Sequence, residues 1–160
     1  MGAKSHQTNP NWLKGLMKEY ESQLEVAIGL PTGTTGVSTI YPNGGETVVE
    51  AAILNEYGSD SDKIPARPFM HSSYNKIREK VEPIAAWGVK KINIGKIDKK
   101  TILGLMGAAA VGVVKQTITD FSTPPNAPYT IRKKGFNNPL IETGLLRQTI
   151  TYAVRKSGKK

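Results

Sequence analysis

Residues able to carry out acid–base or metal chemistry are few in this sequence. It has two histidines, His6 near the start and His71 directly after the segment IPARPFM, and no cysteine. Catalysis by a general base or an activated nucleophile needs such a group beside a suitable partner. Without cysteine, disulfides, thiolate nucleophiles and sulfur-ligated metal centres are excluded. A lone histidine next to a predicted helix start is interpreted as a capping or surface residue.

Acidic residues gather in one segment, NEYGSDSD, which holds Glu56, Asp60 and Asp62. The segment lacks the twelve-residue spacing and final bidentate glutamate of a calcium-binding EF-hand, so we interpret it as a solvated turn. Glu142, between apolar residues and a Thr-Gly pair, is interpreted as a capping or ion-pairing residue. The motifs of metalloproteases, serine hydrolases, P-loop proteins and dinucleotide-binding proteins are absent from the sequence. We predict no enzymatic activity, no metal and no cofactor.

Basic residues beside an aromatic residue give the strongest binding signal. The formal net charge is +9, and the segment IRKKGF places three cations next to Phe136. Such a composition can follow a phosphate backbone and stack on a base. The basic residues are spread along the whole chain, however, and no helix-turn-helix, zinc-finger or RNA-binding signature accompanies them. A small basic nucleic-acid-binding protein is therefore the alternative hypothesis, with these residues facing DNA: Arg132, Lys133, Lys134, Lys159 and Lys160.

The segment IPARPFM, residues 64–70, is predicted to be stiff and extended, and we call it the strap. Pro65 and Pro68 restrict φ and push the residue before each of them away from helical conformations. Two interpretations are open. In one, a neighbouring polypeptide clamps the strap, Phe69 fills an apolar socket and Arg67 pairs with a carboxylate. In the other, the strap joins a strand to a helix within one subunit.

Around these residues the patterns predict a single α+β domain over residues 1–160. Apolar residues at three- and four-residue steps predict an amphipathic helix from residue 10 to just before Gly29. β-Branched residues between turn signals predict a meander of short antiparallel strands over 30–62, with PNGG at 42–45 as a hairpin tip. Residues 48–57 fit either a strand or a helix, and a strand is favoured.

Two longer helices are predicted next. Ser72 or Ser73 is expected to cap the first, which Pro83 bends or divides. Asp98 is expected to cap the second, which ends near residue 121. In this second helix small residues recur at four-residue steps and predict a close contact with another core element: Gly104, Ala108 and Gly112.

The C-terminal part is predicted to contain a long loop, a helical turn and a strand. Residues 122–139, with four prolines, form the loop. Residues 145–148 form the turn, and TITYAVR alternates as a half-buried strand. Residues 1–10 and 156–160 are expected to be flexible tails. The fold expected is a short antiparallel sheet packed against two or three longer helices, with long proline-rich loops. The longest apolar run, 102–114, is shorter than a bilayer span, so a soluble protein without membrane contact is predicted.

Three segments, in this order, resemble a known family: NEYGSDSDKIPARPFM, PPNAPYTIRKKGFNNPLIETG and GLLRQTITYAV. They are similar to signature segments of the virion-morphogenesis or tail-completion proteins of long-tailed bacteriophages, a family similar to the minor tail protein Z group. The matches cover roughly residues 53–71 and 124–155. Glu142 stands where aspartate is commoner and Thr149 where serine is usual, and both changes keep the charge or the hydroxyl group.

The resemblance implies a structural protein of the virion neck or tail, made in the host cytoplasm, that completes the tail or joins it to the head. Its implied partners are copies of itself, in a sixfold or twelvefold ring, and other tail, neck or connector proteins. Non-specific contact with DNA is a further option, and no membrane contact is implied. The positions carried over are Glu56, Tyr57, Gly58, Ile64, Pro65, Arg67, Pro68, Phe69, Pro139, Leu140, Thr143, Gly144, Leu145, Arg147, Ile150 and Tyr152. The predicted protein-interface residues are Tyr57, Ile64, Arg67, Phe69, Arg132, Lys133, Lys134, Phe136, Leu145 and Arg147.

Overall fold

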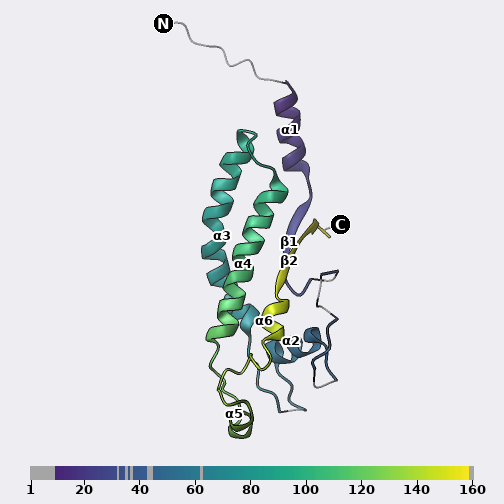
Figure 1. Ribbon diagram of the computed structural model, residues 1–160. Helices are drawn as coiled ribbons and strands as arrows, with labels where there is room; N and C mark the ends of the chain where they lie inside the picture. Colours follow the sequence, from purple (N-terminus) through teal and green to yellow (C-terminus); the bar gives the residue numbers. More distant parts are fainter. Residues whose placement is uncertain are drawn as a thin grey trace.

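The computed structural model describes residues 10–31, 33–34, 36, 38–42, 45–61 and 63–158. Within these ranges the chain is an α+β protein in which a two-stranded antiparallel sheet packs against helices, as the sequence predicts. Helix α4 lies between α3 on one side and the sheet on the other (Figure 1). The elements, in chain order, are α1 (Pro10–Glu21), β1 (Leu24–Gly29), α2 (Val48–Tyr57), α3 (Phe69–Asn93), α4 (Lys99–Asp120), α5 (Pro128–Lys134), α6 (Leu145–Thr149) and β2 (Thr151–Lys156).

Helices α3 and α4 form an antiparallel hairpin whose close packing depends on a glycine. A β-carbon at Gly88 would lie 2.6 Å from Ile102 Cδ1, so a larger residue would force the two helices apart. Asp98 caps α4, as predicted, because its side chain accepts a hydrogen bond from the backbone N–H three residues later. Glu19 of α1 adds a second acceptor at this end, for the N–H of Lys99 at 2.8 Å.

The start of α3 differs from the predicted serine cap at Ser72 or Ser73. The helix begins at Phe69 with Pro68 in the N-cap position. Ser73 is buried, and its hydroxyl donates back to the Phe69 carbonyl over 2.7 Å. Pro83 lies inside a continuous helix of 25 residues, so it does not divide the helix.

The predicted N-terminal helix is shorter than expected. Helix α1 ends at Glu21, and LEVAIG forms strand β1 in place of the last helical turns. This strand pairs with β2 at the other end of the chain, placing Val26 opposite Val154 and Ile28 opposite Tyr152. Both of these β1 residues are β-branched and fit a pleated surface, and the partner strand decides the outcome. Local periodicity could not reveal a partner so distant in sequence.

The predicted meander over 30–62 does not form. Among the residues described there, β pairing is limited to isolated bridges between Ile40 and Thr47 and between Ser59 and Ile64. The Asn-Gly pair of the predicted hairpin tip, residues 43 and 44, lies outside the described residues.

Residues 48–57, for which a strand was favoured, form helix α2. The Thr47 hydroxyl accepts from the N–H of Glu50, and the Glu50 carboxylate accepts from the N–H of Thr47. This capping box satisfies two backbone donors at once and fixes the start of the helix. The T-x-x-E spacing in the sequence is the signal for this capping box.

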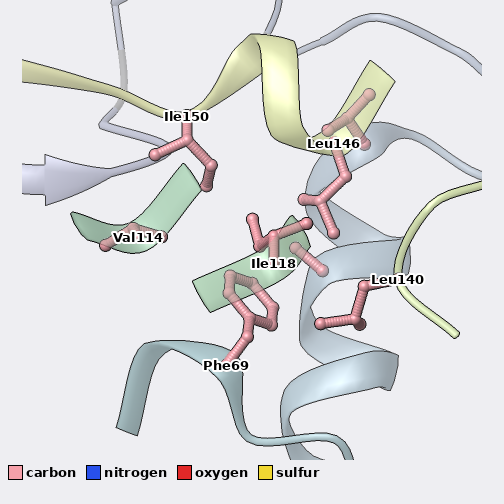
Figure 2. Close-up of a cluster of buried hydrophobic side chains, with 8 residues drawn as sticks. Phe69, Val114, Ile118, Leu140, Leu146 and Ile150 are labelled. Atoms are coloured by element: carbon pink, nitrogen blue, oxygen red, sulfur yellow. The ribbon is translucent and has the colours of Figure 1, made fainter. Parts of the chain in front are cut away.

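The main core lies where the C-terminal half of α4 meets α2, α6 and the start of α3 (Figure 2). Its side chains come from segments far apart in the sequence, so the core closes only when all of them are in place. The labelled members are Phe69, Val114, Ile118, Leu140, Leu146 and Ile150, each at most 6% exposed.

The predicted C-terminal turn and strand are confirmed as α6 and β2. The predicted loop over 122–139 contains the short helix α5 and is otherwise irregular. Asn138 ties this loop to α4, because its amide nitrogen donates to the carbonyls of Ile118 and Thr119. Its side-chain oxygen accepts from the N–H groups of Leu140 and Ile141, both at 2.9 Å.

Of the predicted stripe of small residues, Gly104 faces the sheet, where an added β-carbon would lie 3.7 Å from the Tyr152 hydroxyl, but the close contact is made by Gly107, outside the stripe. A β-carbon at Gly107 would lie 2.5 Å from Tyr152 Cδ2, whereas one at Gly112 would meet nothing within 4 Å. Ala108 and Gly112 are exposed. The buried face consists of Ile102, Gly107, Ala110, Val114, Thr117 and Ile118.

By length and composition, α4 is also a helix that could cross a membrane. Core helices of soluble proteins pass the same test, and α4 packs against α3 and against both strands. The predicted absence of membrane contact stays a prediction.

Candidate functional site

The strap is held by its own subunit along its backbone. Ile64 closes an isolated bridge across the preceding turn, and the N–H of Arg67 donates to the carbonyl of Asn55 in α2 over 2.5 Å. Gly58 is required at this turn, because its φ is 76° and a β-carbon would lie 2.8 Å from the nitrogen of Ala66. Of the two interpretations of the strap, the backbone therefore fits the one in which it joins two elements of the same subunit. The first of these elements is helix α2, where a strand was predicted, and the second is α3.

The side chains of the strap also bind within the subunit. Phe69 is 2% exposed and fills a socket in its own core, which corrects its prediction as an interface residue. Arg67 donates to Asn55 Oδ1 at 3.3 Å and to the carbonyls of Pro124 and Pro125 at 3.4 Å. In the described chain these uncharged oxygens replace the predicted carboxylate, and Arg67 forms no ion pair there.

Glu56 has a structural role that explains its place in the acidic segment. Its carboxylate accepts from the N–H of Met70 at 2.9 Å and from the N–H of His71 at 3.0 Å. These donors belong to the first turn of α3, where an anion is favoured because the backbone N–H groups have no helical partner. Glu56 thus caps α3, which the side chain of Pro68 cannot do. The interpretation of Glu56 as part of a solvated turn is therefore wrong.

A surface cavity of about 820 Å³ lies beside the strap. It is lined by residues of all three segments that carry the family resemblance: Ile64 and Arg67 from the first, Lys134 and Glu142 from the second, and Leu146 from the third. Helix α2 completes the wall. We call this cavity the strap pocket.

Cations of the strap pocket are not paired with carboxylates inside the described chain. Lys134 Nζ donates to the carbonyl of Asn138 at 2.9 Å and lies 5.0 Å from the centre of the Phe136 ring. Burial, and to a lesser extent the charge of Arg67, lowers the pKa of Lys134, while Glu142 opposes this shift. Burial also lowers the pKa of Arg67. Arg67 and Lys134 line the cavity together with a third cation, Lys63, and two carboxylates, Glu46 and Glu142. The two partly desolvated cations can still form charge-assisted hydrogen bonds with a carboxylate of a partner.

Tyr41 lines the same cavity, at a place where the nearby charges are negative. Burial, then the negative charge of Glu142, raises the pKa of its phenol. The phenol is therefore neutral near pH 7. It can act there as a hydrogen-bond donor or acceptor, and the wall of the strap pocket combines it with the two cations.

The remaining predicted interface residues are scattered. Tyr57 is 78% exposed at the end of α2, and Phe136 is 43% exposed after α5. Arg132 and Lys133 are exposed on α5, and Leu145 is half-buried in α6. Arg147 donates to Thr119 Oγ1 at 3.0 Å, across to the end of α4.

Several predicted residues lie outside the described residues: His6, Asp62, Lys159 and Lys160. Within the residues described, no group of three or more His, Cys, Asp or Glu side chains could hold a metal ion. His71 is exposed at the start of α3, with its N–H bound to Glu56.

Sequence reasoning missed the asparagines that build the pocket wall. Asn126 is 8% exposed; its N–H donates to Asn137 Oδ1 at 3.1 Å and its side chain donates to the Asn138 carbonyl. Asn55 Oδ1 accepts from Arg67. The signal available was the high asparagine content of the proline-rich loop, since asparagine side chains pair with backbone groups in turns.

Comparisons with protein-family models, with curated proteins and with solved structures find no match to this chain.

Proposed function

We propose that the chain is a structural subunit of the neck or tail of a long-tailed bacteriophage, a tail-completion or head–tail joining protein that forms a homo-oligomeric ring. The proposal starts from the resemblance of three sequence segments to that family. The gathering of these segments around the strap pocket supports it, because residues that serve one contact are expected to lie together.

The observation that carries the proposal is the amount of surface left open. The accessible surface of the chain is 11019 Å², whereas a compact monomer of this length exposes about 7,900 Å². The residues outside the described part would contribute at most roughly 2,700 Å² to this total if each were counted as fully extended chain, and we subtract that area. The described part would still exceed a compact monomer of its own size by about 1,100 Å². A standard interface buries about 800 Å² on each partner, so the excess is comparable in area to one such interface.

Large apolar side chains make up part of this open surface. The most exposed are Tyr57 at 78%, Tyr129 at 69% and Tyr74 at 66%, with Ile40 and Tyr20 next. Tyrosine is enriched in protein interfaces because it combines a large apolar ring with a hydrogen-bonding group. These side chains are spread over several elements, which favours a subunit that contacts more than one neighbour.

In the proposed assembly the strap pocket receives an acidic group of a neighbouring virion protein. Arg67 and Lys134 supply the charge, and the three hydrogen bonds of Arg67 hold its guanidinium in place before binding. A pre-positioned cation loses less side-chain entropy on binding. The ring size and the flanking proteins are taken from the family resemblance.

The test is the mass and shape of the purified chain and its presence in the particle. Size-exclusion chromatography with light scattering should give a multiple of the chain mass, and electron microscopy should show rings or the protein in the virion neck or tail. A chain that stays monomeric alone and with its virion partners would contradict the proposal. Tight DNA binding at a defined site, with a steep loss of affinity as salt is added, would favour the nucleic-acid-binding alternative.

A further inference from the structure

The two strands of the sheet each have one neighbour in the described chain, so each has an open edge. Both strands are six residues long and pair along their whole length. The N–H of Ser157 donates to the carbonyl of Gln23, which fixes the alternation of hydrogen-bonded pairs along the ladder. It follows that the backbone groups of these residues point away from the partner strand: Leu24, Val26 and Ile28 on β1, and Tyr152, Val154 and Lys156 on β2.

Hydrogen-bond partners for these outward groups are almost absent from the described chain. The N–H of Leu24 donates to the carbonyl of Ser22. No other backbone bond is made from either open edge to any described residue. Neither strand contains proline or a bulge, but both carry charged side chains, which also protect natural edge strands: Glu25 on β1 and Arg155 and Lys156 on β2. The open edges can therefore pair with a strand whose charges complement these side chains.

The side chains of the sheet show the same incomplete covering. Val26 and Tyr152 face α4 at Gly107, and Ile28 and Val154 share their face by strand alternation. All four are only half-buried, although they form the inward face of the sheet. A further strand alongside would extend this face and cover it more fully.

We propose that the open edge of β1 pairs, antiparallel, with the open edge of β2 of a second copy of this chain. This inference rests on the proposed function, because it supplies the contact that closes the ring. Rotation about an axis roughly along the strands keeps strand direction, so β2 of one copy and β1 of the next run antiparallel, as the two strands do within one copy. The result is one continuous antiparallel sheet around the ring.

Charge and symmetry favour this pairing over a twofold dimer. Strand β1 carries Glu25 and no base, and β2 carries Arg155 and Lys156 and no acid. Within one copy Glu25 and Arg155 already form an ion pair at 2.9 Å, so the two sequences are compatible as neighbours. A twofold dimer would join β1 to β1 or β2 to β2, bring like charges together and leave the other edge open. Head-to-tail pairing closes both edges in every copy.

The test uses single-cysteine variants, which is direct because the chain has no cysteine. Ala27→Cys on β1 and Ala153→Cys on β2 lie on the face turned away from α4, and both residues are half-exposed. These two positions pair within one copy, so each variant carries only one of them. The two proteins, one with an affinity tag, are assembled together and treated with a mild oxidant. A disulfide can join cysteines on adjacent strands, whose α-carbons lie about 4.5–5.5 Å apart, but not cysteines two strands apart, at about 9.6 Å. Glu79→Cys, exposed on α3, which packs on the other side of α4 from the sheet, replaces one partner as the control.

The expected result is a band of twice the chain mass that contains both variants, formed only in the mixture of Ala27→Cys and Ala153→Cys. Circular dichroism should show that each variant keeps the native fold. Cross-linked dimers from either variant alone would overturn the head-to-tail pairing. A ring seen by light scattering without the mixed cross-link would overturn this inference and leave the proposed function standing. A chain that never assembles would overturn both.

Discussion

The ring of Tyr152 on β2 lies directly against Gly107 of α4. A β-carbon at Gly107 would lie 2.5 Å from Tyr152 Cδ2 and 2.9 Å from Val26 Cγ2. The sheet therefore rests on the helix through a position where no larger side chain fits. This contact sets the distance between α4 and both strands.

Replacing this glycine by alanine should destabilise the fold. Gly107→Ala forces the tyrosine ring or the strand to move, and we expect a loss of about 1–3 kcal/mol in the free energy of unfolding. Gly112→Ala is the matched control on the same helix, since its β-carbon would meet nothing within 4 Å. There the better helix propensity of alanine should add up to about 1 kcal/mol. Chemical denaturation of both variants gives the comparison, and equal effects would contradict the contact.

Removing the carboxylate of Glu56 should weaken the start of α3. Glu56→Ala leaves the N–H groups of Met70 and His71 without their acceptor, and the loss of such a cap costs about 1–2 kcal/mol. Glu56→Gln keeps one side-chain oxygen and should lose less. Glu79→Ala, at an exposed site further along α3, is the control and should change stability little. Protection of the α3 amides from hydrogen exchange would locate the effect, and unchanged exchange at 70 and 71 would argue against the cap.

Stability should depend on acid through Asp98. Hydrogen bonds from the side chain and then the backbone of Thr101 lower the pKa of Asp98 below its ordinary value of 3.8. A lowered pKa means that the carboxylate stabilises the folded state above pH 3.8 and that this contribution is lost as the pH falls through the folded-state pKa.

Asp98→Ala should therefore unfold about 1 kcal/mol more easily at pH 7, and its difference from the native protein should shrink below pH 3.8. Asp98→Asn keeps the capping oxygen without the charge, so at pH 7 its stability should lie between those of Asp98→Ala and the native protein, and titration of this position should no longer change it as the pH falls below 3.8. Urea titrations at several pH values give the measurement. A difference that is constant down to pH 2 would contradict the linkage.

Phe69→Ala should lower the free energy of unfolding of the monomer, and any defect in assembly should follow from that loss of stability. The side chain is 2% exposed and packs in the core with Val114 and Ile118 (Figure 2). Truncating a buried phenylalanine costs about 3–5 kcal/mol. Tyr129→Ala, at 69% exposure, is the control and should leave the free energy of unfolding within about 0.5 kcal/mol. A stable, soluble Phe69→Ala monomer that fails only in assembly would restore the interface interpretation.

Prediction from the sequence worked for three elements whose determining contacts are local. Asp98 and the residues after it specify the start of α4 by themselves, and the α6 turn and the alternation of β2 were also read correctly. Prediction failed for residues 24–29, where the spacing of apolar residues indicates a helix and the β-branched residues favour a strand. They form strand β1 because β2 pairs with them. Prediction also failed for 48–57, where we favoured a strand although Thr47 and Glu50 form a capping box.

The candidate site shows the same division. The three segments were identified from the sequence, and the structure brings them together at the strap pocket. The partners of Arg67 could not be predicted, because Pro124 and Pro125 reach it only after the loop has folded against the strap. The sequence also could not show that Gly107 makes the closest contact between helix and sheet. Helix α4 contains three glycines, and only the position of the strands distinguishes them.

By itself the sequence determined that the chain is α+β, that it has no cysteine chemistry, and that Asp98 begins α4. These follow from backbone geometry and side-chain chemistry within a few residues. Only the tertiary structure decided that LEVAIG is a strand, that Phe69 is core, and that two strand edges stay open. Each of these depends on which distant segment lies alongside, and the free energy of that packing exceeds the local preferences.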